Sequence, residues 1–347
     1  MSEYQLKDRE KAILRFVIHQ FILTASPVGS RNISKRYDIG LSPASIRNIM
    51  ADLEDLGFLN HPHTSAGRIP TDKGYRVYVD SLMDPPMLDI KSKQIIKENL
   101  SQSSSETEEL LKITTSILSD LTNQLAMATY PKFEQAILEK IQIVKLSSTR
   151  ILVIVTVKTG LIKTITLEID AEVKEEHISF IQQFLNERLS GLKFSEIRET
   201  LKDRIKDYDS ESLRPIVRVF IDSVDKIFTD TGNDKAVISG ARNILSQPEF
   251  EDTGQFQSII ELIENKDVVI HILDNKTKTG DDFNVTIGKE LSEEKYSDYS
   301  MITKEYKIGD LNGTLGIMGP KRMDYSKIIA AIVYIAEQLS QELTKSR

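Results

Sequence analysis

The segment from Ser42 to Ala51 carries side chains that could read DNA bases. Small and hydrogen-bonding residues share one face of the helix that this segment predicts: Ala44, Ser45, Arg47, Asn48 and Ala51. Arg pairs with guanine and Asn with adenine in the major groove, which such a helix enters by its N-terminal end. An ordinary surface helix carries more Glu and Lys on its outer face. The pattern therefore favours a helix that contacts DNA over one whose outer face is only solvated. Arg47 and Asn48 could each contact a base, a phosphate or a neighbouring residue.

Basic and small residues on both sides of this helix extend the predicted DNA-binding surface. The loop 60–68 is rich in small residues, which let the backbone approach DNA, and it ends at Arg68, which reaches a phosphate or the narrow minor groove. We expect no catalytic, cofactor-binding or metal-binding residue. The candidate DNA-contacting residues are Arg31, Ser42, Ala44, Ser45, Arg47, Asn48, His61, His63, Thr64, Ser65 and Arg68.

Three helices must position these side chains. Apolar residues recur at helical spacing over 6–21 and predict the first helix. Ser26-Pro27 combines a capping hydroxyl with a Pro, whose missing N–H costs nothing at a helix start, and predicts a second helix that ends near Tyr37. After a tight turn, Ser42-Pro43 repeats this signal and opens the third helix, which Gly57 ends in a left-handed conformation.

A short hairpin is predicted after the third helix. Phe58 and Leu59 indicate one strand and Ile69 a second, and the loop between them is typical of a wing. Thr71 caps a fourth helix, which ends at Met83-Asp84-Pro85-Pro86 because Pro cannot continue it. Residues 1–84 are therefore predicted to form a winged helix-turn-helix domain.

The rest of the chain predicts an α/β domain with an insertion. A polar linker is expected over 85–105, and Ser105 with Glu108 forms a capping box for a helix that reaches Leu125. The helical periodicity of 171–250 interrupts two sets of strands, which indicates one α/β domain made of 106–170 and 251–347. The predicted strands and final helix are Lys140–Leu146, Ile151–Val157, Leu161–Ile169, Val268–Leu273, Asn284–Ile287, Ser300–Ile308, Thr314–Met318 and Tyr325–Leu343.

Composition limits the classes of protein. The 347 residues exceed one typical core, and they include no Cys, which excludes disulfides, zinc ribbons and thiol catalysis. The longest apolar run, 328–336, is far shorter than the ~20 residues that cross a bilayer, so we expect a soluble, cytoplasmic protein with no membrane partner.

Charge is distributed unevenly along the chain. The net charge is −7, but residues 1–83 contain 11 Lys and Arg against 9 Asp and Glu, and the remainder contains 34 against 43. DNA binding therefore depends on locally placed arginines more than on a basic field.

Three other patterns have simpler explanations than chemistry. Asp281-Asp282 and Glu293-Glu294 have no nearby His or apolar pocket to shift a pKa, so solvated loop charges are favoured over acid/base catalysis. His61 and His63 lack a third metal ligand nearby, so the wing interpretation is favoured. The glycines between 309 and 319 are not followed by Gly-Lys-Ser or Gly-Lys-Thr, so they predict turns and a strand end instead of a phosphate loop.

A family resemblance is carried by two strings, PVGSRNISKRYDIGLSPASIRNIMADLEDLGFLNHPHTSAGRIPTDKGYRVYVDSLM and GIMGPKRMDYSKIIAAI. The first resembles the N-terminal domain, and the second the C-terminal motif, of the HrcA family of bacterial heat-inducible transcription repressors. Ser45 stands where many relatives carry Thr, a change that keeps the hydroxyl. The middle of the chain is similar to the family only in pattern.

The resemblance implies a multidomain α+β fold and a function. A GAF-like domain, 106–170 and 251–347, would contain an inserted dimerisation domain at 171–250. The chain would be a dimeric repressor of chaperone operons that binds an inverted-repeat operator in double-stranded DNA. The chaperonin would keep it competent to bind, and heat would release repression when unfolded proteins occupy the chaperonin.

Two alternative functions remain open from the sequence. The GAF-like domain could sense a small molecule and act through the same DNA-binding domain, although no cofactor is expected. An enzyme in the C-terminal region is disfavoured because no nucleophile, base and orienting group can be identified there.

Overall fold

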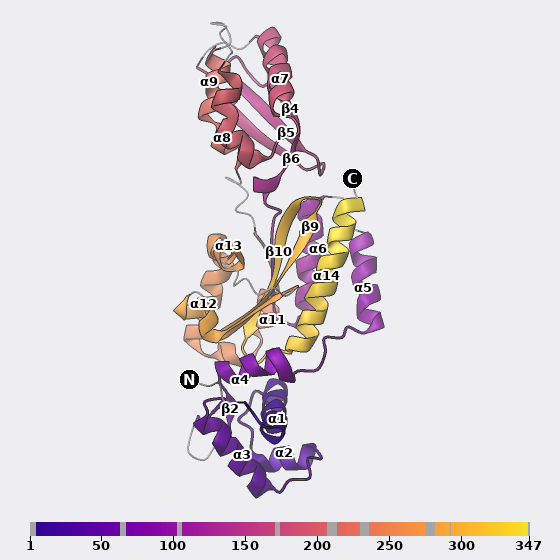
Figure 1. Cartoon of the computed structure of the whole chain (residues 1–347), viewed down its shortest axis with the longest axis vertical. Helices are drawn as coiled ribbons and strands as arrows, with labels where there is room; N and C mark the ends of the chain where they lie inside the picture. Colours follow the sequence, from indigo (N-terminus) through magenta and orange to yellow (C-terminus); the bar gives the residue numbers. More distant parts are fainter. Residues whose placement is uncertain are drawn as a thin grey trace. The chain divides into compact units, whose positions relative to one another are not determined.

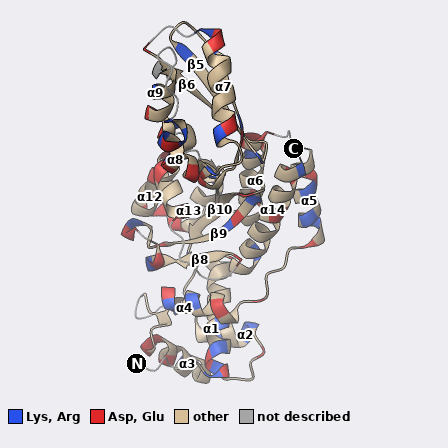
Figure 2. Ribbon diagram, turned by 45° about the horizontal axis from the view of Figure 1, so that its top comes forward, with Lys and Arg blue, Asp and Glu red and all other residues tan. Residues whose placement is uncertain are grey.

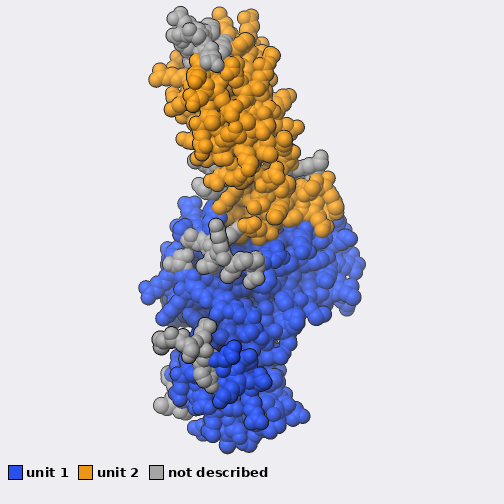
Figure 3. All heavy atoms as spheres, in the orientation of Figure 1, with its two compact units in different colours: residues 1–128, 236–304, 315–338 blue, residues 129–235, 305–314, 339–347 orange. Residues whose placement is uncertain are grey.

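The computed structural model describes residues 5–62, 67–102, 106–170, 174–206, 214–229, 236–274, 282–291 and 293–345. The chain forms two compact units, shown in different colours in Figure 3. Unit 1 comprises residues 1–128, 236–304 and 315–338, and unit 2 comprises residues 129–235, 305–314 and 339–347.

The N-terminal part of unit 1 is a group of helices followed by a short hairpin (Figure 1). The predicted first, third and fourth helices are confirmed. They enclose fully buried apolar side chains, among them Ile13, Leu14, Ile33, Ile46 and Leu53. The elements are α1 (Asp8–Thr24), α2 (Ser30–Arg36), α3 (Pro43–Asp55), β1 (Leu59–Asn60), β2 (Ile69–Pro70) and α4 (Asp72–Val77), which continues as the π-helical turn η1 (Tyr78–Leu82).

The second helix begins later than predicted. The Ser26-Pro27 signal was wrong as a helix start, because α2 begins at Ser30 and has Gly29 at its N-cap. Val28 instead forms an antiparallel bridge with Arg68 through two backbone hydrogen bonds of 2.9 Å. This pairing requires an extended backbone at Val28, so the helix cannot start before it.

The hairpin consists of β1 and β2, which pair antiparallel with Leu59 opposite Pro70. The first strand begins one residue after the predicted start. Residues 63–66 of the connecting loop lie outside the described residues, and they include the predicted DNA-contacting residues His63, Thr64 and Ser65.

A helix occupies the segment that was predicted to be a linker. Helix α5 (Ile90–Ser101) begins at Asp89, whose side chain accepts a hydrogen bond of 2.9 Å from the Ser92 N–H. Its Ile96 and Leu100 side chains are buried. The other positions of this segment are mostly polar. The apolar stripe of this amphipathic helix is therefore narrow, and the composition alone indicated a linker.

Helix α6 (Thr107–Thr122) is shorter than predicted. Its N-cap is Glu106, and the predicted cap Ser105 lies outside the described residues. Asn123 ends the helix in a left-handed conformation with φ 55°. Leu125, which was assigned to the helix, instead begins the buried strand β3 (Leu125–Thr129).

Five strands form a sheet in the order β7-β3-β10-β9-β8. Strand β10 pairs antiparallel with β3, and β8 pairs antiparallel with β9. The additional elements of this part are β7 (Ala236–Ser239), α11 (Ala241–Leu245), η3 (Pro248–Glu251), α12 (Thr253–Glu264), α13 (Lys266–Asp274), β8 (Asn284–Ile287), η4 (Gly288–Glu290), η5 (Glu294–Tyr296), β9 (Tyr299–Ile308), β10 (Leu311–Pro320) and α14 (Tyr325–Lys345).

The predicted strand at 268–273 is wrong, because this segment forms α13. Its buried side chains, Val269, Ile272 and Leu273, are spaced three and four residues apart and join a core with residues of β3 and β10. Helical burial thus outweighs the strand preference of β-branched residues, which depends strongly on context.

Unit 2 has a separate antiparallel sheet in the order β4-β5-β6. The first set of predicted strands is therefore not part of the same sheet as the second set. Alternate residues of β5, including Ile151, Val153 and Val155, share one core with the helices of 174–229. The elements of unit 2 are η2 (Phe133–Gln135), β4 (Leu138–Lys145), β5 (Arg150–Val157), β6 (Ile162–Glu168), α7 (Glu175–Leu189), α8 (Phe194–Ile205), α9 (Arg214–Asp222) and α10 (Val224–Phe228).

Candidate nucleic-acid interface

A serine pair caps the N-terminus of α3. Ser42 Oγ accepts a hydrogen bond of 3.1 Å from the Ser45 N–H and lies 3.0 Å from Ser45 Oγ, while Pro43 occupies the first helical position. The cap satisfies a backbone donor that has no partner inside the helix. Both serines are exposed, so this confirmed helix start also presents hydroxyl groups at the surface.

The outer face of α3 is open. Ala44, Arg47 and Asn48 are exposed, and Ala51 is half-buried. In the part of the chain that the structure describes, neither Arg47 nor Asn48 forms a side-chain hydrogen bond or an ion pair. The helix therefore presents a guanidinium and a carboxamide whose hydrogen-bonding groups are available to a ligand.

An aromatic contact holds the turn that leads into α3. The Phe16 and Tyr37 rings stack with their centroids 4.1 Å apart, and His19 Nδ1 lies 2.8 Å from the Tyr37 hydroxyl oxygen. Arg36 points toward α1, where its Nη1 donates to Gln20 Oε1 at 2.9 Å. Arg31, in the first turn of α2, and Arg36 are both exposed, but Arg36 is engaged by Gln20, so Arg31 is the better placed of the two to meet a phosphate.

Two residues of the hairpin that were predicted to contact DNA, His61 and Arg68, lie beside Glu54 of α3. Arg68 Nε lies 2.7 Å from Glu54 Oε2, and the Arg68 side chain is only 18% exposed. His61 Nδ1 lies 3.8 Å from Glu54 Oε1. The role of Arg68 toward phosphate stays a prediction, and it requires this guanidinium to leave Glu54.

Gly67 allows the hairpin to approach the segment before α2. A Cβ at this position would overlap the Val28 carbonyl, which accepts a hydrogen bond from the Arg68 N–H. A side chain at position 67 is therefore incompatible with the bridge that fixes the end of the loop.

Helix α4 fixes the C-terminal end of α3, a role that was not among the sequence-based predictions. Lys73 Nζ donates to the Leu56 carbonyl at 2.9 Å, and Thr71 Oγ1 donates to the Gly57 carbonyl at 2.7 Å. Gly74 packs so closely on Phe58 that a Cβ would overlap its carbonyl. A glycine inside a predicted helix is destabilising unless close packing needs it, and this was the available signal.

Charges of both signs cover α1 to α4. In Figure 2, acidic and basic residues are interspersed along the ribbon of these helices. Among the residues described, no group of three or more His, Cys, Asp or Glu side chains could hold a metal ion. No described helix is both long enough and apolar enough to cross a membrane.

The chain is similar to known proteins along almost its whole length. Residues 108–329 match the model of the HrcA protein C-terminal domain. The heat-inducible transcription repressor HrcA of Chlorobium phaeobacteroides is 36% identical over 99% of this chain and 100% of its own length, and that of Chlorobium limicola is 39% identical over 99% of each.

A solved structure of a protein described as hypothetical has the same fold. It has a TM-score of 0.59 and 22% sequence identity, and the match covers 99% of this chain and 100% of the other. The sequence relatives define the class of protein, which is a heat-inducible transcription repressor and not an enzyme. The chain belongs to the HrcA family.

Proposed function

We propose that residues 1–84 form a winged helix-turn-helix that reads an inverted-repeat operator upstream of chaperone genes. The observation that carries this proposal is the outer face of α3, where Arg47 and Asn48 are exposed and unpaired among the described residues. The hairpin takes the role of the wing. Arg31, Ser42, Ala44, Ser45 and His61 are the other described residues that we assign to the DNA surface, together with Arg68 once it leaves Glu54.

A footprint tests this function directly. Full-length protein and duplex DNA from the promoters of its own chaperone genes should give a protected region with two symmetric halves. A scrambled duplex of the same length and composition is the control. Equal affinity for both duplexes would contradict sequence-specific repression.

We also propose that the repressor is a dimer whose contacts come from unit 2. An inverted repeat requires two reading helices related by two-fold symmetry. Unit 2 contains the segment 174–229 and exposes several large apolar side chains, with Phe180 50%, Leu146 51%, Val144 45% and Ile162 61% exposed. The five-stranded sheet with its helices is then the GAF-like domain. Sedimentation of the full chain should give the mass of two copies.

The chaperonin link is a further part of the proposed function, supported by the family alone. Protein heated mildly until operator binding is lost should recover more binding with chaperonin and nucleotide than with nucleotide alone. Equal recovery in the two samples would remove the chaperonin from the proposal and leave the repressor function intact.

A further inference from the structure

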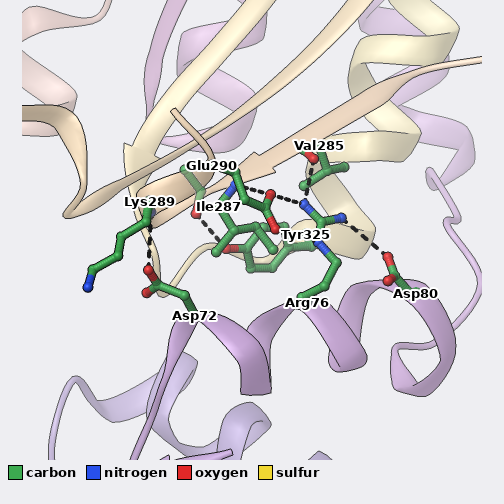
Figure 4. A network of polar contacts seen from close by, with 9 residues as sticks. Asp72, Arg76, Asp80, Val285, Ile287, Lys289, Glu290 and Tyr325 are labelled. Atoms are coloured by element: carbon green, nitrogen blue, oxygen red, sulfur yellow. Dashed lines mark hydrogen bonds and ion pairs between the residues drawn. The ribbon is translucent and has the colours of Figure 1, made fainter. Parts of the chain in front are cut away.

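The two family motifs, far apart in sequence, meet in unit 1. Residues 71–76, from the first motif, form the start of α4, and residues 319–325, from the second, lead into α14. Together with residues 285–290 they form a network of polar contacts (Figure 4). We call this network the latch.

Asp72 forms one half of the latch. Its Oδ1 lies 2.8 Å from Lys321 Nζ, and its Oδ2 accepts a hydrogen bond of 3.1 Å from the Lys289 N–H. The carboxylate sits against Gly288, which has a φ of +57° and where a Cβ would overlap it. An ion pair, a backbone hydrogen bond and a close steric fit thus converge on one side chain.

Arg76 forms the other half, one helical turn further along α4. Its Nε donates to Glu290 Oε1 at 2.9 Å, its Nη2 donates to the Val285 carbonyl at 2.7 Å and to Glu290 Oε2, and its Nη1 lies 3.2 Å from Asp80 Oδ1. Glu290 Oε2 also accepts the Ile287 N–H at 2.9 Å. The planar guanidinium suits this bidentate geometry, which Lys could not reproduce.

Two buried tyrosines fill the centre of the latch. The Tyr75 and Tyr325 rings lie 6.0 Å apart, and both side chains are almost fully buried. Burial raises the pKa of both phenols, so they are neutral at physiological pH. The latch therefore combines a buried aromatic centre with ion pairs at its edge, as a specific domain contact does.

Other residues at the start of α4 hold the reading helix. Lys73 and Thr71 donate to the carbonyls of Leu56 and Gly57 at the end of α3, and the Lys73 ammonium lies 4.3 Å from the centre of the Phe58 ring. One short helix thus contacts the end of α3 through one set of residues and the α/β part of unit 1 through another.

We propose that the latch sets the orientation of α3, so that Asp72 and Arg76 are positioning residues for operator binding although they lie outside the reading face. This inference rests on the proposed DNA-binding function. In the latched arrangement the outer face of α3 is exposed, so latching is compatible with DNA contact. A dimer gains from two linked sites only when their separation suits the operator, and the latch restricts that separation more than the chain segment 83–89 does.

The first experiment measures the orientation without DNA. Because the chain has no Cys, spin labels can be placed only at Asp55→Cys on α3 and Glu337→Cys on α14, both exposed positions in unit 1. The doubly labelled full chain is diluted with unlabelled chain and studied by pulsed dipolar spectroscopy. We expect the distance distribution to broaden on adding Asp72→Asn with Arg76→Gln.

The matched control is Glu261→Gln, which removes a 2.8 Å ion pair with Lys295 elsewhere in unit 1. It should leave the distribution unchanged. Equal distributions in the latch variant and the unmodified chain would overturn the latch. This outcome does not depend on whether the chain binds DNA.

The second experiment uses a duplex that carries the footprinted promoter site and a duplex that carries one half of it. The latch variant should bind the full site about 2- to 30-fold more weakly, the range found for mutations that modulate coupling between sites, and should bind the half-site as tightly as the unmodified chain. Equal loss on both duplexes would indicate a damaged reading domain and overturn the positioning role, as would unchanged affinity for the full site. If even the unmodified chain binds neither duplex, the proposed function fails, while the spin-label distances still decide whether the latch exists.

Discussion

Helices α3 and α4 follow each other in the chain but use their charged side chains in opposite ways. Arg47 on α3 is exposed and, among the described residues, has no polar partner, whereas Arg76 on α4 contacts two carboxylates and a carbonyl. A side chain that reads DNA must keep its hydrogen-bonding groups available until the ligand arrives. A side chain that positions a helix must already be engaged by its partners. Arg68 lies between these cases, because it is paired with Glu54 in this structure and must leave that partner before it can contact DNA.

The largest expected effect comes from separating the two reading helices of the proposed dimer. Phe180→Glu places a charge among the exposed apolar side chains of unit 2, and it should convert the proposed dimer to monomers. Loss of linkage between two sites reduces affinity by about 10²- to 10⁴-fold. Sedimentation and operator titration measure the two effects. Phe256→Glu, at a side chain in unit 1 that is 43% exposed, is the matched control and should change neither.

Removing a base contact should have the next largest effect. Arg47→Ala or Asn48→Ala is expected to weaken operator binding by about 1–3 kcal/mol, the value of a bidentate base contact, with an unchanged melting temperature. Titration of the operator and of a scrambled duplex separates specific from general binding. Wild-type operator affinity in both variants would remove the outer face of α3 from the interface.

The Ser42 cap of α3 is expected to affect both the stability of the helix and the affinity for DNA. Ser42→Ala removes the acceptor of the Ser45 N–H and should destabilise the helix by about 1 kcal/mol. Ser42→Asp keeps an acceptor and should preserve stability, but it adds a negative charge beside the DNA phosphates and should weaken binding. Chemical denaturation and DNA titration of both variants test whether the two effects separate. Equal stability of all three proteins would contradict the role of the cap.

The smallest effect concerns Arg68, and its direction depends on the residue changed. Arg68→Ala should lower affinity for every sequence and reduce the salt slope by about 1, as expected for one lost phosphate contact. Glu54→Gln releases the same guanidinium, so it should raise affinity for every sequence by up to about 5-fold, which corresponds to a partly exposed ion pair. Titrations at several salt concentrations measure both, and an unchanged slope in Arg68→Ala would exclude the phosphate contact.

Features encoded within a few residues were predictable from the sequence. Ser42-Pro43 and Gly57 define the ends of α3 because a cap hydroxyl and a left-handed glycine act locally, and Thr71 begins α4 for the same reason. The exposed positions of α3 followed from its apolar stripe. The predicted contacts themselves remain predictions.

Features that depend on distant partners could not be predicted. The Ser26-Pro27 signal fails because Val28 pairs with Arg68. The strands of 138–168 were predicted to share one α/β domain with the later strands, but they form a separate sheet, since alternation shows that a strand is half-buried but not which sheet it joins. The latch could not be predicted because Arg76 and Glu290 are 214 residues apart in the sequence. The two motifs that contribute to it indicate the family, but neither indicates that they contact each other.

The long sequence separation of the latch has a consequence for biosynthesis. Residues 72–76 leave the ribosome early, but Lys321, a partner of Asp72, follows 249 residues later. Domains generally fold as they emerge, and contacts between distant segments form late. The nascent chain therefore passes through a stage in which helices α1 to α4 are complete but not yet anchored by the latch, and a chain that stops before residue 285 never leaves that stage.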